Sequence, residues 1–559
     1  MSEPIDRRKF LSHSLRLAAG TALLGGGASS LLAACGSSSS SSSGARAHSY
    51  DGVSTEVGRH GGQLTFGTEA EETGFDPHSD SWDESGILYA RTVYDPLAIV
   101  AMDGTIQPYL AQSITPNQDY SVWSIQARPG VLFHDGVPFD AQALYANLTA
   151  SKHALLTGIT LGPMESVSII DSMTVSVKMS QPWVPFDAYL AGGIGGQVAY
   201  MMSPAILGTG KATTHPIGTG PFVFDQWVPN SHFTATANPH YWRPGLPYLS
   251  QITYKPIPDA QARLASLESG AVDIIHTSTA QSILQLRSKL GYGYVDDSGK
   301  VVGETDMGYV MLNVGKSPFN DARVRQAIAY STNYAQYLSV VDSNVNEGSI
   351  GPFDAGTPYY GPTEYPSYNL AKAKKLVSDY ERTNGRISFE LSTTDNPTNS
   401  SILSLLQGMW QRAGISSTIN LVDQDTLISN AENGGFQANL WRQGAAVDPD
   451  LNYIFWSSTT VGKEGGLSIN FARNADPVMQ AALEKGRTDP DPQVRAEAYK
   501  LVARRFASDL PYIWLDRTVW AIGADPKVRN FNYATVPNGG RGFGMMEGII
   551  WPTQLWIAL

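Results

Sequence analysis

The fold is decided by residues 387–442, which read ISFELSTTDNPTNSSILSLLQGMWQRAGISSTINLVDQDTLISNAENGGFQANLWR. Apolar residues at every second position predict strands, apolar residues at helical spacing predict helices, and Gly414 is a typical helix end. The elements expected in chain order are a strand at 387–391, a helix at 400–413, a strand at 419–421, a helix at 426–432 and a strand at 436–442. Such alternation indicates a parallel or mixed sheet with right-handed crossovers, and therefore an α/β lobe.

The first half of the chain has a different rhythm, in which short alternating strands are separated by turns. Residues 122–125 alternate as a strand should, and Asp135-Gly136 is a tight-turn signal. Asp140 is expected to cap a helix, and residues 167–177 predict a hairpin. A β-rich region therefore precedes the α/β pattern.

Length and charge limit the possible classes of protein. The chain has 559 residues, of which 42% are hydrophobic, so more than one core can be buried and two or more lobes are expected. Its formal net charge is -12 and its pI is near 5.3. Because affinity for nucleic acids comes mainly from clustered Lys and Arg, this balance argues against a nucleic-acid partner.

The first 35 residues are interpreted as an export signal rather than part of the fold. Residues 7–11, RRKFL, form a twin-arginine signature, and a weakly apolar, glycine-rich stretch follows. Residues 32–35, LAAC, resemble the lipobox of bacterial lipoproteins, in which the cysteine thiol is acylated. A chance cysteine is the alternative. Since Cys35 is the single cysteine of the chain, disulfides, cysteine metal sites and a cysteine nucleophile are all excluded.

Residues 36–60 contain a serine run at 37–43 and are expected to form a flexible tether, by which the protein would hang from a membrane. Downstream, the long uncharged stretch is 188–210. Its glycines and Pro204 make it a poor spanning helix, so it is interpreted as loop and buried strand.

Several motifs follow one another in a fixed order along the mature chain. They are VYDPL at 93–97, DGTIQPYLA at 103–111, RPGVLFHDGVPF at 128–139, PIGTGPF at 216–222, NPHYW at 238–242, LASLESGAVDI at 264–274 and PFNDARVRQAI at 318–328. In this order they resemble the dipeptide, oligopeptide and nickel solute-binding proteins of ABC importers, which are solute-binding protein family 5. Most of the motifs are expected to be scaffold, since their turns let backbone segments approach closely.

The resemblance implies an α/β, two-lobed periplasmic-binding-protein-like fold of type II, with an extra subdomain in the first lobe and a ligand cleft between the lobes. The expected divisions are a signal peptide at 1–35, a tether at 36–60, lobe I at 61–305 with the extra subdomain at about 90–215, lobe II at 306–519 and a return to lobe I at 520–559. The chain is expected to cross between the lobes near Asp306 and near Trp520.

The stretch expected to face the ligand is 441–450, WRQGAAVDPD, because ligands of α/β lobes lie beyond strand ends. The resemblance implies that dipeptide-binding members use an aspartate of this loop to pair with the peptide amine, and alignment on residues 448–450 places Ala445 there. A free amine would then need another counter-charge, since a buried ammonium without one is costly. The candidates are Asp448, Glu69 and Glu71, and Gln443 and Gly444 complete the predicted ligand loop.

Arg442 is a candidate for a bidentate pair with a carboxylate or phosphate of the ligand. The alternative is an arginine that pairs with a carboxylate of one of the lobes or lies in solvent. Aromatic rings are candidates for stacking walls, with core packing as the alternative for each of them. These residues are Trp82, Trp441, Tyr453 and Trp456.

No metal or cofactor is expected. The ligand loop lacks the His and Trp of nickel-binding members, and the ten histidines include no close metal-ligand pair within the mature lobes. His78 and the acidic residues that follow it are interpreted as a solvated turn. An enzyme is the rival class, but the chain has no Gly-x-Ser-x-Gly, no His-Glu-x-x-His and no complete phosphate-binding loop.

These features predict a substrate-binding lipoprotein of an ABC importer, not an enzyme. It is expected to capture peptides or peptide-like small solutes by hinge closure and to deliver them to permease subunits in the membrane. The alternatives are a receptor for a non-peptide small organic or anionic solute and, in a different class, a secreted hydrolase. The protein is expected to be a monomer outside the cytoplasm, in the periplasm or on the outer face of the cytoplasmic membrane.

Overall fold

The computed structural model describes residues 50–193, 196–289, 291–298, 305–444, 446–463 and 466–558. The chain divides into the units Met1–Arg46 and Ala47–Leu559, and every described element belongs to the second unit. The predicted signal peptide, Cys35 and the serine run lie outside the described residues.

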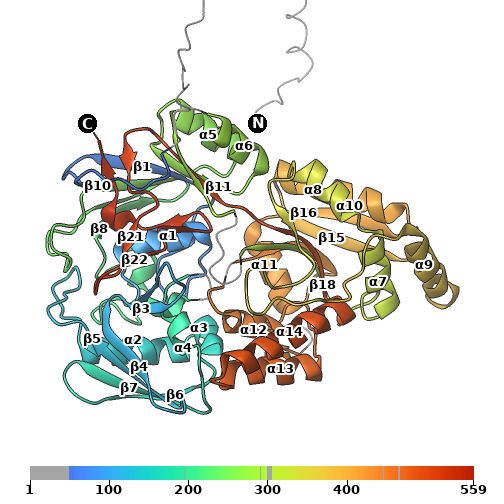
Figure 1. Ribbon diagram of the computed structural model, residues 1–559, viewed down its shortest axis with the longest axis horizontal. Coiled ribbons are helices and arrows are strands. Elements are labelled where there is room, and N and C mark those ends of the chain that lie inside the picture. Colours follow the sequence, from blue (N-terminus) through green and yellow to red (C-terminus); the bar gives the residue numbers. More distant parts are fainter. Residues whose placement is uncertain are drawn as a thin grey trace, which may run out of the picture. The chain divides into compact units, whose positions relative to one another are not determined.

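One part of the second unit, which we name lobe I, is built on a mixed sheet with the strand order β12–β19–β11–β1–β10–β9–β8 (Figure 1). Its strands are β1 (Gln63–Thr68), β8 (Phe222–Val228), β9 (His232–Ala237), β10 (Gln251–Pro256), β11 (Ile274–Thr277), β12 (Gly293–Asp296) and β19 (Ala521–Ala524). The central strand β1 pairs in parallel with β10 and β11, whereas β19 is antiparallel to both β11 and β12. Lobe I also contains α1 (Glu84–Val93), α5 (Ala260–Glu268) and α6 (Ala280–Ser288).

Lobe II is built on a second mixed sheet, with the order β14–β18–β13–β17–β15–β16. Its strands are β13 (Met307–Leu312), β14 (Glu347–Gly348), β15 (Ser388–Thr394), β16 (Ser416–Val422), β17 (Ala438–Gln443) and β18 (Tyr512–Arg517). Its helices are α7 (Ala322–Ser331), α8 (Tyr334–Val341), α9 (Leu370–Asn384), α10 (Pro397–Gln411), α11 (Gln424–Asn433), α12 (Tyr453–Trp456), α13 (Pro477–Thr488) and α14 (Pro492–Asp509). β15 is parallel to β16 and β17, and β13 is antiparallel to β17 and β18.

The alternation predicted for residues 387–442 is therefore the β15–α10–β16–α11–β17 segment of lobe II. Helix α10 begins at Pro397, earlier than the predicted start at residue 400. The reason is local, because the side chain of Asn396 accepts a hydrogen bond from the Asn399 amide and Pro397 occupies the first helical turn.

The chain passes between the two sheets twice. It leaves the sheet of lobe I after Asp296, enters that of lobe II at Met307, and returns between Arg517 and Ala521. The two connecting segments lie close together, since the Trp520 amide donates a hydrogen bond to Asp297 Oδ1 at 2.8 Å.

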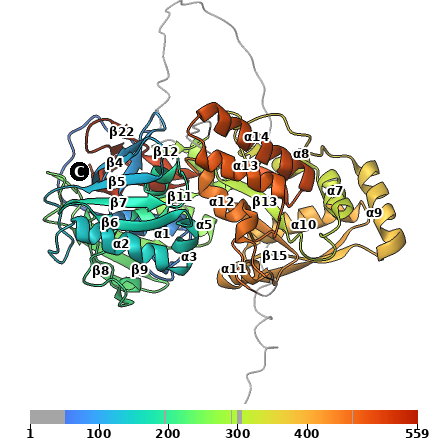
Figure 2. The same cartoon turned by 90° about the horizontal axis from the view of Figure 1, so that it is seen from below.

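Lobe I carries an additional antiparallel sheet with the order β4–β5–β7–β6, against which helix α2 packs (Figure 2). Its strands are β4 (Ala111–Pro116), β5 (Val122–Ala127), β6 (Met164–Ile169) and β7 (Thr174–Met179), and its helices are α2 (Ala141–His153), α3 (Leu155–Thr160) and α4 (Phe186–Tyr189). The predicted hairpin is β6–β7, and Asp140 caps α2 as predicted by accepting from the amides of Gln142 and Ala143.

The remaining elements are short. Two-residue and three-residue strands form the pairs β2 (Ala98–Val100) with β3 (Ile106–Pro108), β20 (Val528–Arg529) with β25 (Trp556–Ile557), β21 (Ala534–Thr535) with β22 (Arg541–Gly542), and β23 (Met545–Met546) with β24 (Ile549–Ile550). The 3-10 turns are η1 (Gln197–Ala199), η2 (Lys211–Thr213), η3 (Pro449–Asn452), η4 (Ser458–Thr460) and η5 (Pro552–Gln554).

The buried strand predicted within 188–210 is wrong for the described residues of that range. They contain the end of α4, the turn η1 and loops, and Tyr200 makes only an isolated bridge with Pro96. Tyr189, Tyr200, Met201 and Met202 are nevertheless buried. The range is therefore hydrophobic, but it lacks the regular alternation of apolar and polar residues that marks a strand. A search of the described helices for one with the length and apolar character to cross a membrane finds none.

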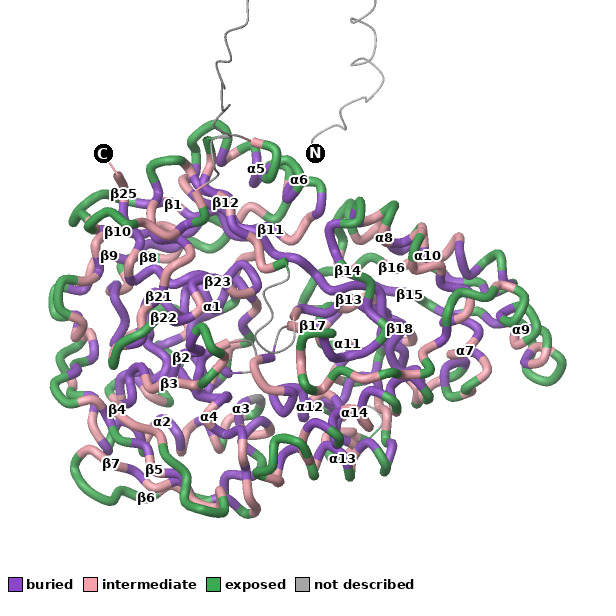
Figure 3. The backbone as a smooth tube through the Cα atoms, viewed as in Figure 1, coloured by how far each residue is buried: buried purple, intermediate pink, exposed green. Residues whose placement is uncertain are grey.

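The inner strands of both main sheets are buried, as Figure 3 shows for β11, β13 and β18. Covering both faces of a sheet with helices or loops explains why these strands are mostly apolar rather than alternating, although β11 ends in His276-Thr277 and β18 in Asp516-Arg517. Each lobe has its own hydrophobic core, around Phe66 and Tyr254 in lobe I and around Leu391 and Leu406 in lobe II.

The first described residues belong to lobe I. The Tyr50 ring packs edge-on against Phe531 with ring centroids 5.6 Å apart, and its carbonyl accepts a hydrogen bond from the Tyr294 amide of β12 at 2.9 Å. The Ser54 amide donates to Asn530 Oδ1 at 3.0 Å. Tyr50 and Ser54, which belong to the predicted flexible tether, therefore pack along the edge of the sheet of lobe I instead.

Candidate ligand site between the lobes

Arg442, on β17 of lobe II, extends to carboxylates on the side of lobe I. Its Nη2 lies 3.1 Å from Glu69 Oε1 and 3.5 Å from Glu84 Oε2, and its Nε lies 3.2 Å from Asp306 Oδ2. Its Nη1 also donates a hydrogen bond to Ser278 Oγ at 3.1 Å. Because Glu69, Glu84 and Ser278 belong to lobe I, Arg442 joins the two lobes.

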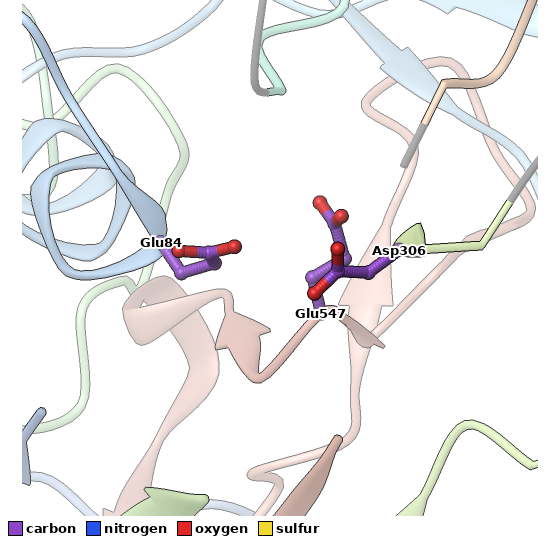
Figure 4. Close-up of side chains that lie close together, drawn as sticks. All are labelled: Glu84, Asp306 and Glu547. Atoms are coloured by element: carbon purple, nitrogen blue, oxygen red, sulfur yellow. The ribbon is translucent and has the colours of Figure 1, made fainter. Parts of the chain in front are cut away.

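The carboxylates of this site come from separate elements. Glu69 directly follows β1, Glu84 is the first residue of α1, Asp306 immediately precedes β13, and Glu547 lies in the turn between β23 and β24. Oxygens of Glu84, Asp306 and Glu547 lie within 4.8 Å of one another, and Figure 4 shows the three side chains converging. We name Glu69, Glu84, Asp306 and Glu547 the carboxylate cluster.

The turn that carries Glu547 has an unusual backbone. Glu547 and Gly548 have φ values of 52° and 70°, which is the pattern of a two-residue hairpin turn with both central residues left-handed. A Cβ on Gly548 would lie 2.6 Å from Trp520 Cε3, so glycine is required there. A non-glycine residue at positive φ is uncommon, and here it places a buried carboxylate in the cluster.

Burial and mutual repulsion set the charge of the cluster. Burial raises the pKa of Glu84 to about 8, and Asp306 is among the neighbouring acids that add to the rise while Arg442 opposes it. Burial likewise raises the pKa of Asp306 to about 7 despite Arg442. Burial alone would raise the pKa of Glu69. Arg442 and the other basic groups around Glu69 instead hold this pKa below its ordinary value. One guanidinium therefore does not compensate the whole cluster near neutral pH.

Trp520 forms an aromatic wall beside this cluster. The guanidinium carbon of Arg442 lies 4.8 Å from the centre of the Trp520 ring, within the range of a cation–π interaction. The Trp520 Nε1 donates to Asp306 Oδ2 at 3.1 Å, which fixes the ring and the carboxylate together. The His276 ring lies against Trp520 at 5.4 Å, and its Nε2 accepts from the Glu69 amide at 2.9 Å.

A second contact between the lobes is made by Asp450, which is completely buried. Within lobe II it pairs with Arg487, whose Nε lies 2.9 Å from Asp450 Oδ1. From lobe I, Trp183 Nε1 donates to Asp450 Oδ2 at 2.8 Å, and the Tyr189 hydroxyl donates to the carbonyl and the carboxylate of Asp450. The additional sheet region of lobe I thus meets the loop that follows β17.

The residues predicted for the ligand loop have different environments. Gln443 is buried and accepts a hydrogen bond from the Tyr309 hydroxyl at 3.3 Å. Asp448 is paired with Arg495 at 2.7 Å, so its charge is already compensated. Gly444 is half-buried, and Ala445, at the predicted amine-binding position, lies outside the described residues.

The aromatic residues predicted as stacking walls follow the packing alternative. Trp82 is buried in the core of lobe I and donates its Nε1 hydrogen to the Gly74 carbonyl at 3.0 Å. Tyr453 and Trp456 are buried in a core of lobe II, and Trp441 packs against that core. The rings of Trp82, Tyr453 and Trp456 continue the hydrophobic cores of the lobes, whereas the ring of Trp441 is only partly buried.

Two further predictions about charged residues are resolved by the geometry. Glu71 accepts a hydrogen bond from Trp227 Nε1 at 2.7 Å instead of pairing with Arg442. The solvated turn predicted around His78 is wrong, because His78 is 8% exposed and its Nδ1 lies 3.3 Å from Asp76 Oδ1.

Several residues of these two contacts were not predicted as site residues, and Asp450 was predicted only as the end of the ligand-facing stretch 441–450. They are Glu84, Ser278, Glu547, Trp183, Tyr189 and Arg487. Asp306 and Trp520 had been predicted only as crossing points between the lobes. A usable signal was present for Glu547, since an acidic residue followed by glycine between two apolar pairs is typical of a tight hairpin turn. No local pattern indicates that such a turn lies beside Glu84 and Asp306.

The fold and this interlobe site define a two-lobed solute-binding protein, and the comparisons with known proteins agree. The sequence profile described as "Bacterial extracellular solute-binding proteins, family 5 Middle" matches residues 105–465. The chain therefore belongs to family 5 of the bacterial extracellular solute-binding proteins.

Individual relatives are distant. The chain is 26% identical over 462 residues to a glutathione-binding protein GsiB of Pectobacterium atrosepticum, covering 79% of this chain and 86% of the relative. Two solved structures are similar at a TM-score of 0.78 and 21% identity: AgaA of A. tumefaciens R10 in complex with agropinic acid, and the oligopeptide-binding protein AppA of Bacillus subtilis in complex with a nonapeptide. The matches cover 89% of this chain and 99% of AgaA, and 90% of this chain and 100% of AppA. They show the same two-lobed fold.

Proposed function

We propose that this solute-binding protein captures peptides or peptide-like small solutes between lobes I and II. The observation that carries the proposal is the meeting of charged side chains from both lobes at Arg442, where Glu69 and Ser278 face β17. A solute between the lobes can replace such contacts and so stabilise closure. The relatives named for glutathione and oligopeptides support a peptide-like class.

Glu69 is the counter-charge we assign to an amine of the solute. It is the more accessible member of the pairs made by Arg442, with 19% of its side-chain surface exposed against 7% for Glu84 and 0% for Asp306. Asp448 and Glu71 serve this role less well, since their partners Arg495 and Trp227 belong to the same lobe as they do, whereas Arg442 reaches Glu69 from the other lobe. An anionic solute is disfavoured because Arg442 is already surrounded by carboxylates.

The proposed mechanism is hinge closure about the connecting segments that contain Asp306 and Trp520, between a lobe I of residues 61–305 and 520–559 and a lobe II of residues 306–519. Solute contacts in both lobes favour the closed form, which docks on the permease subunits of the importer. The chain binds without catalysing a reaction, and the transporter supplies the energy for import.

We further propose export by the twin-arginine route and acylation of Cys35, which would hold the monomer on the outer face of a membrane. The support is the order of signature, apolar stretch, lipobox and serine run in the sequence. Loss of the lipid after Cys35→Ala, seen by mass spectrometry of membrane fractions, is the expected result. Retention of acylated protein in that variant would contradict the proposal.

The test of the ligand class is native mass spectrometry of the mature protein purified from its host. A bound molecule of peptide mass, which yields amino acids on acid hydrolysis, is expected at one per chain. Glu69→Gln should weaken its rebinding in calorimetry, whereas Glu165→Gln, an exposed carboxylate paired with Lys178 on the additional sheet, should leave it unchanged. A co-purified molecule without amino acids would reject the peptide class.

A further inference from the structure

We infer that the carboxylate cluster is a subsite for a positively charged organic group of the solute, and that the guanidinium of Arg442 fills this subsite when the solute is absent. The inference rests on the proposed capture of a solute between the lobes and adds to it the charge of the group that is recognised. The chemical class is a guanidinium or a primary ammonium carried on an organic body.

The arrangement of donors and acceptors fits an organic cation. Three carboxylates engage the side chain of Arg442 from different directions, with Glu69 and Glu84 at Nη2 and Asp306 at Nε. The ring of Trp520 covers the guanidinium at 4.8 Å. Several acceptors around a planar cation together with an aromatic wall are the features by which proteins bind guanidinium and ammonium groups, whereas an aromatic wall adds nothing for a bare metal ion.

The cluster retains unused binding capacity. Asp306 is 1% exposed, and its Oδ1 is buried without a hydrogen-bond partner among the described residues. A buried acceptor left unsatisfied costs free energy, which a further donor would recover. Figure 4 shows that the carboxylates of Asp306, Glu84 and Glu547 converge on one region. A second donor group therefore has a defined place to bind.

The carboxyl groups of the cluster can release protons when a further cation binds. Among the described residues, the basic groups that contact Glu69, Glu84 and Asp306 are Arg442 and, beside Glu69, Arg263 and His276. His276 is buried, which lowers its pKa to about 3, so it stays neutral. Asp83 and Asp516 add negative charge nearby. Burial raises the pKa of Glu84 to about 8 and that of Asp306 to about 7, so both carboxyl groups hold protons near neutral pH that a bound cation would displace.

Arg442 is able to leave. Its side chain is 36% exposed although its carboxylate partners are 0–19% exposed, so it borders solvent rather than packed protein. It also belongs to lobe II, whereas Glu69, Glu84 and Glu547 belong to lobe I. When the lobes separate, the guanidinium moves away with β17 and leaves the carboxylates of lobe I open to a cation of the solute.

The test uses n-pentylguanidinium and its uncharged isostere n-pentylurea as probes of the mature protein, at equal ionic strength. The expected result is that the guanidinium raises the melting temperature and binds in calorimetry, while the urea does neither. Arg442→Met should increase the affinity for the guanidinium by about tenfold, because it removes the competing cation. Glu84→Gln and Asp306→Asn should each lower it by about tenfold, and Glu165→Gln should not change it.

Three outcomes would overturn the inference: equal binding of the two probes, no binding of either, or an affinity for the guanidinium that Arg442→Met leaves unchanged. Stronger stabilisation by Ca²⁺ than by the guanidinium, lost in Glu84→Gln, would assign the cluster to a metal ion instead. If circular dichroism shows that one carboxylate variant does not fold, the affinities of the other variant and of Glu69→Gln for the guanidinium test the inference. These results do not depend on whether a peptide co-purifies. The proposal of a peptide ligand and the inference of a cation subsite can therefore be rejected separately.

Discussion

Among single residues, Asp450 carries the most demanding role, because it is buried and receives donors from both lobes. Asp450→Asn should lower the free energy of unfolding by about 3–5 kcal/mol, since it leaves the charge of buried Arg487 without its partner. Urea unfolding followed by circular dichroism measures this change. Glu165→Gln breaks an exposed pair instead and should cost less than about 1 kcal/mol. An equal effect of the two substitutions would contradict this role.

The buried carboxyl groups also predict how stability depends on pH. The pKa values of Glu84 and Asp342 are raised to about 8, and those of Asp306 and Asp297 to about 7, in each case mainly by burial. The folded state therefore binds more protons than the unfolded state between pH 4 and 8. Stability should be greatest below the unfolded pKa values and should fall as pH rises through 7 and 8.

The measurement is the melting temperature of the mature protein from pH 5 to pH 9. A decline with rising pH is expected, and Asp342→Asn, which lies away from the carboxylate cluster, should make the decline shallower. A melting temperature that increases over this range would contradict the pKa shifts. The same direction of proton release predicts that cation binding at the cluster strengthens as pH rises toward 8.

At the scale of elements, two helical glycines give a matched comparison. A Cβ at Gly86 in α1 would lie 2.7 Å from both Glu72 Oε2 and Trp82 Cβ, whereas one at Gly408 in α10 would meet nothing within 4 Å. Gly86→Ala should therefore destabilise the protein by about 1–3 kcal/mol through overpacking. Gly408→Ala should stabilise it by up to about 1 kcal/mol through helix propensity. Melting temperatures that shift in the same direction in the two variants would contradict the close packing described around Gly86.

Elements with local causes could be predicted from the sequence. The β6–β7 hairpin and the β15–α10–β16–α11–β17 segment follow from alternation, turn residues and spacing within a few residues of each element. Helix α10 begins three residues before the predicted start at residue 400, because Asn396 caps it. Helix caps and turns depend on neighbouring residues, so reading them well requires no knowledge of the tertiary structure.

The site could be predicted only in part. Arg442 was identified from its place at the end of a strand, but its partner Glu69 lies 373 positions away along the chain. The pairing depends on how the two sheets face each other in space. The periodicity of the sequence carries no information about that arrangement. The same reason explains why the contact between Trp183 and Asp450 could not be predicted. It also explains why the sequence left both ligand stacking and core packing open for Trp82, Tyr453 and Trp456, which are buried.

At the scale of the whole molecule, the contact around Asp450 predicts a change in the balance between closed and open forms. Trp183→Phe combined with Tyr189→Phe removes the side-chain donors of lobe I to Asp450 and keeps an aromatic ring at each position. Each lost hydrogen bond should weaken closure by about 0.5–1.5 kcal/mol. Small-angle scattering of the solute-free double variant should show a larger radius of gyration than the parent protein.

The control for this scattering experiment is Tyr145→Phe, at an exposed tyrosine of α2. It should leave the radius of gyration unchanged. Adding the solute should return the double variant to the value of the parent protein, because solute contacts supply the free energy that the lost hydrogen bonds no longer provide. An unchanged radius in the double variant would show that these donors do not hold the lobes together.

The attachment of Tyr50 and Ser54 along β12 and Asn530 decides which part of the molecule a tether would hold. A lipid attached upstream of Tyr50 would restrain lobe I, which carries the seven-stranded sheet, and would leave lobe II free to move. Capture would then consist of lobe II closing onto a fixed lobe I. The transporter would therefore contact one surface that stays in place and another whose position depends on whether a solute is bound.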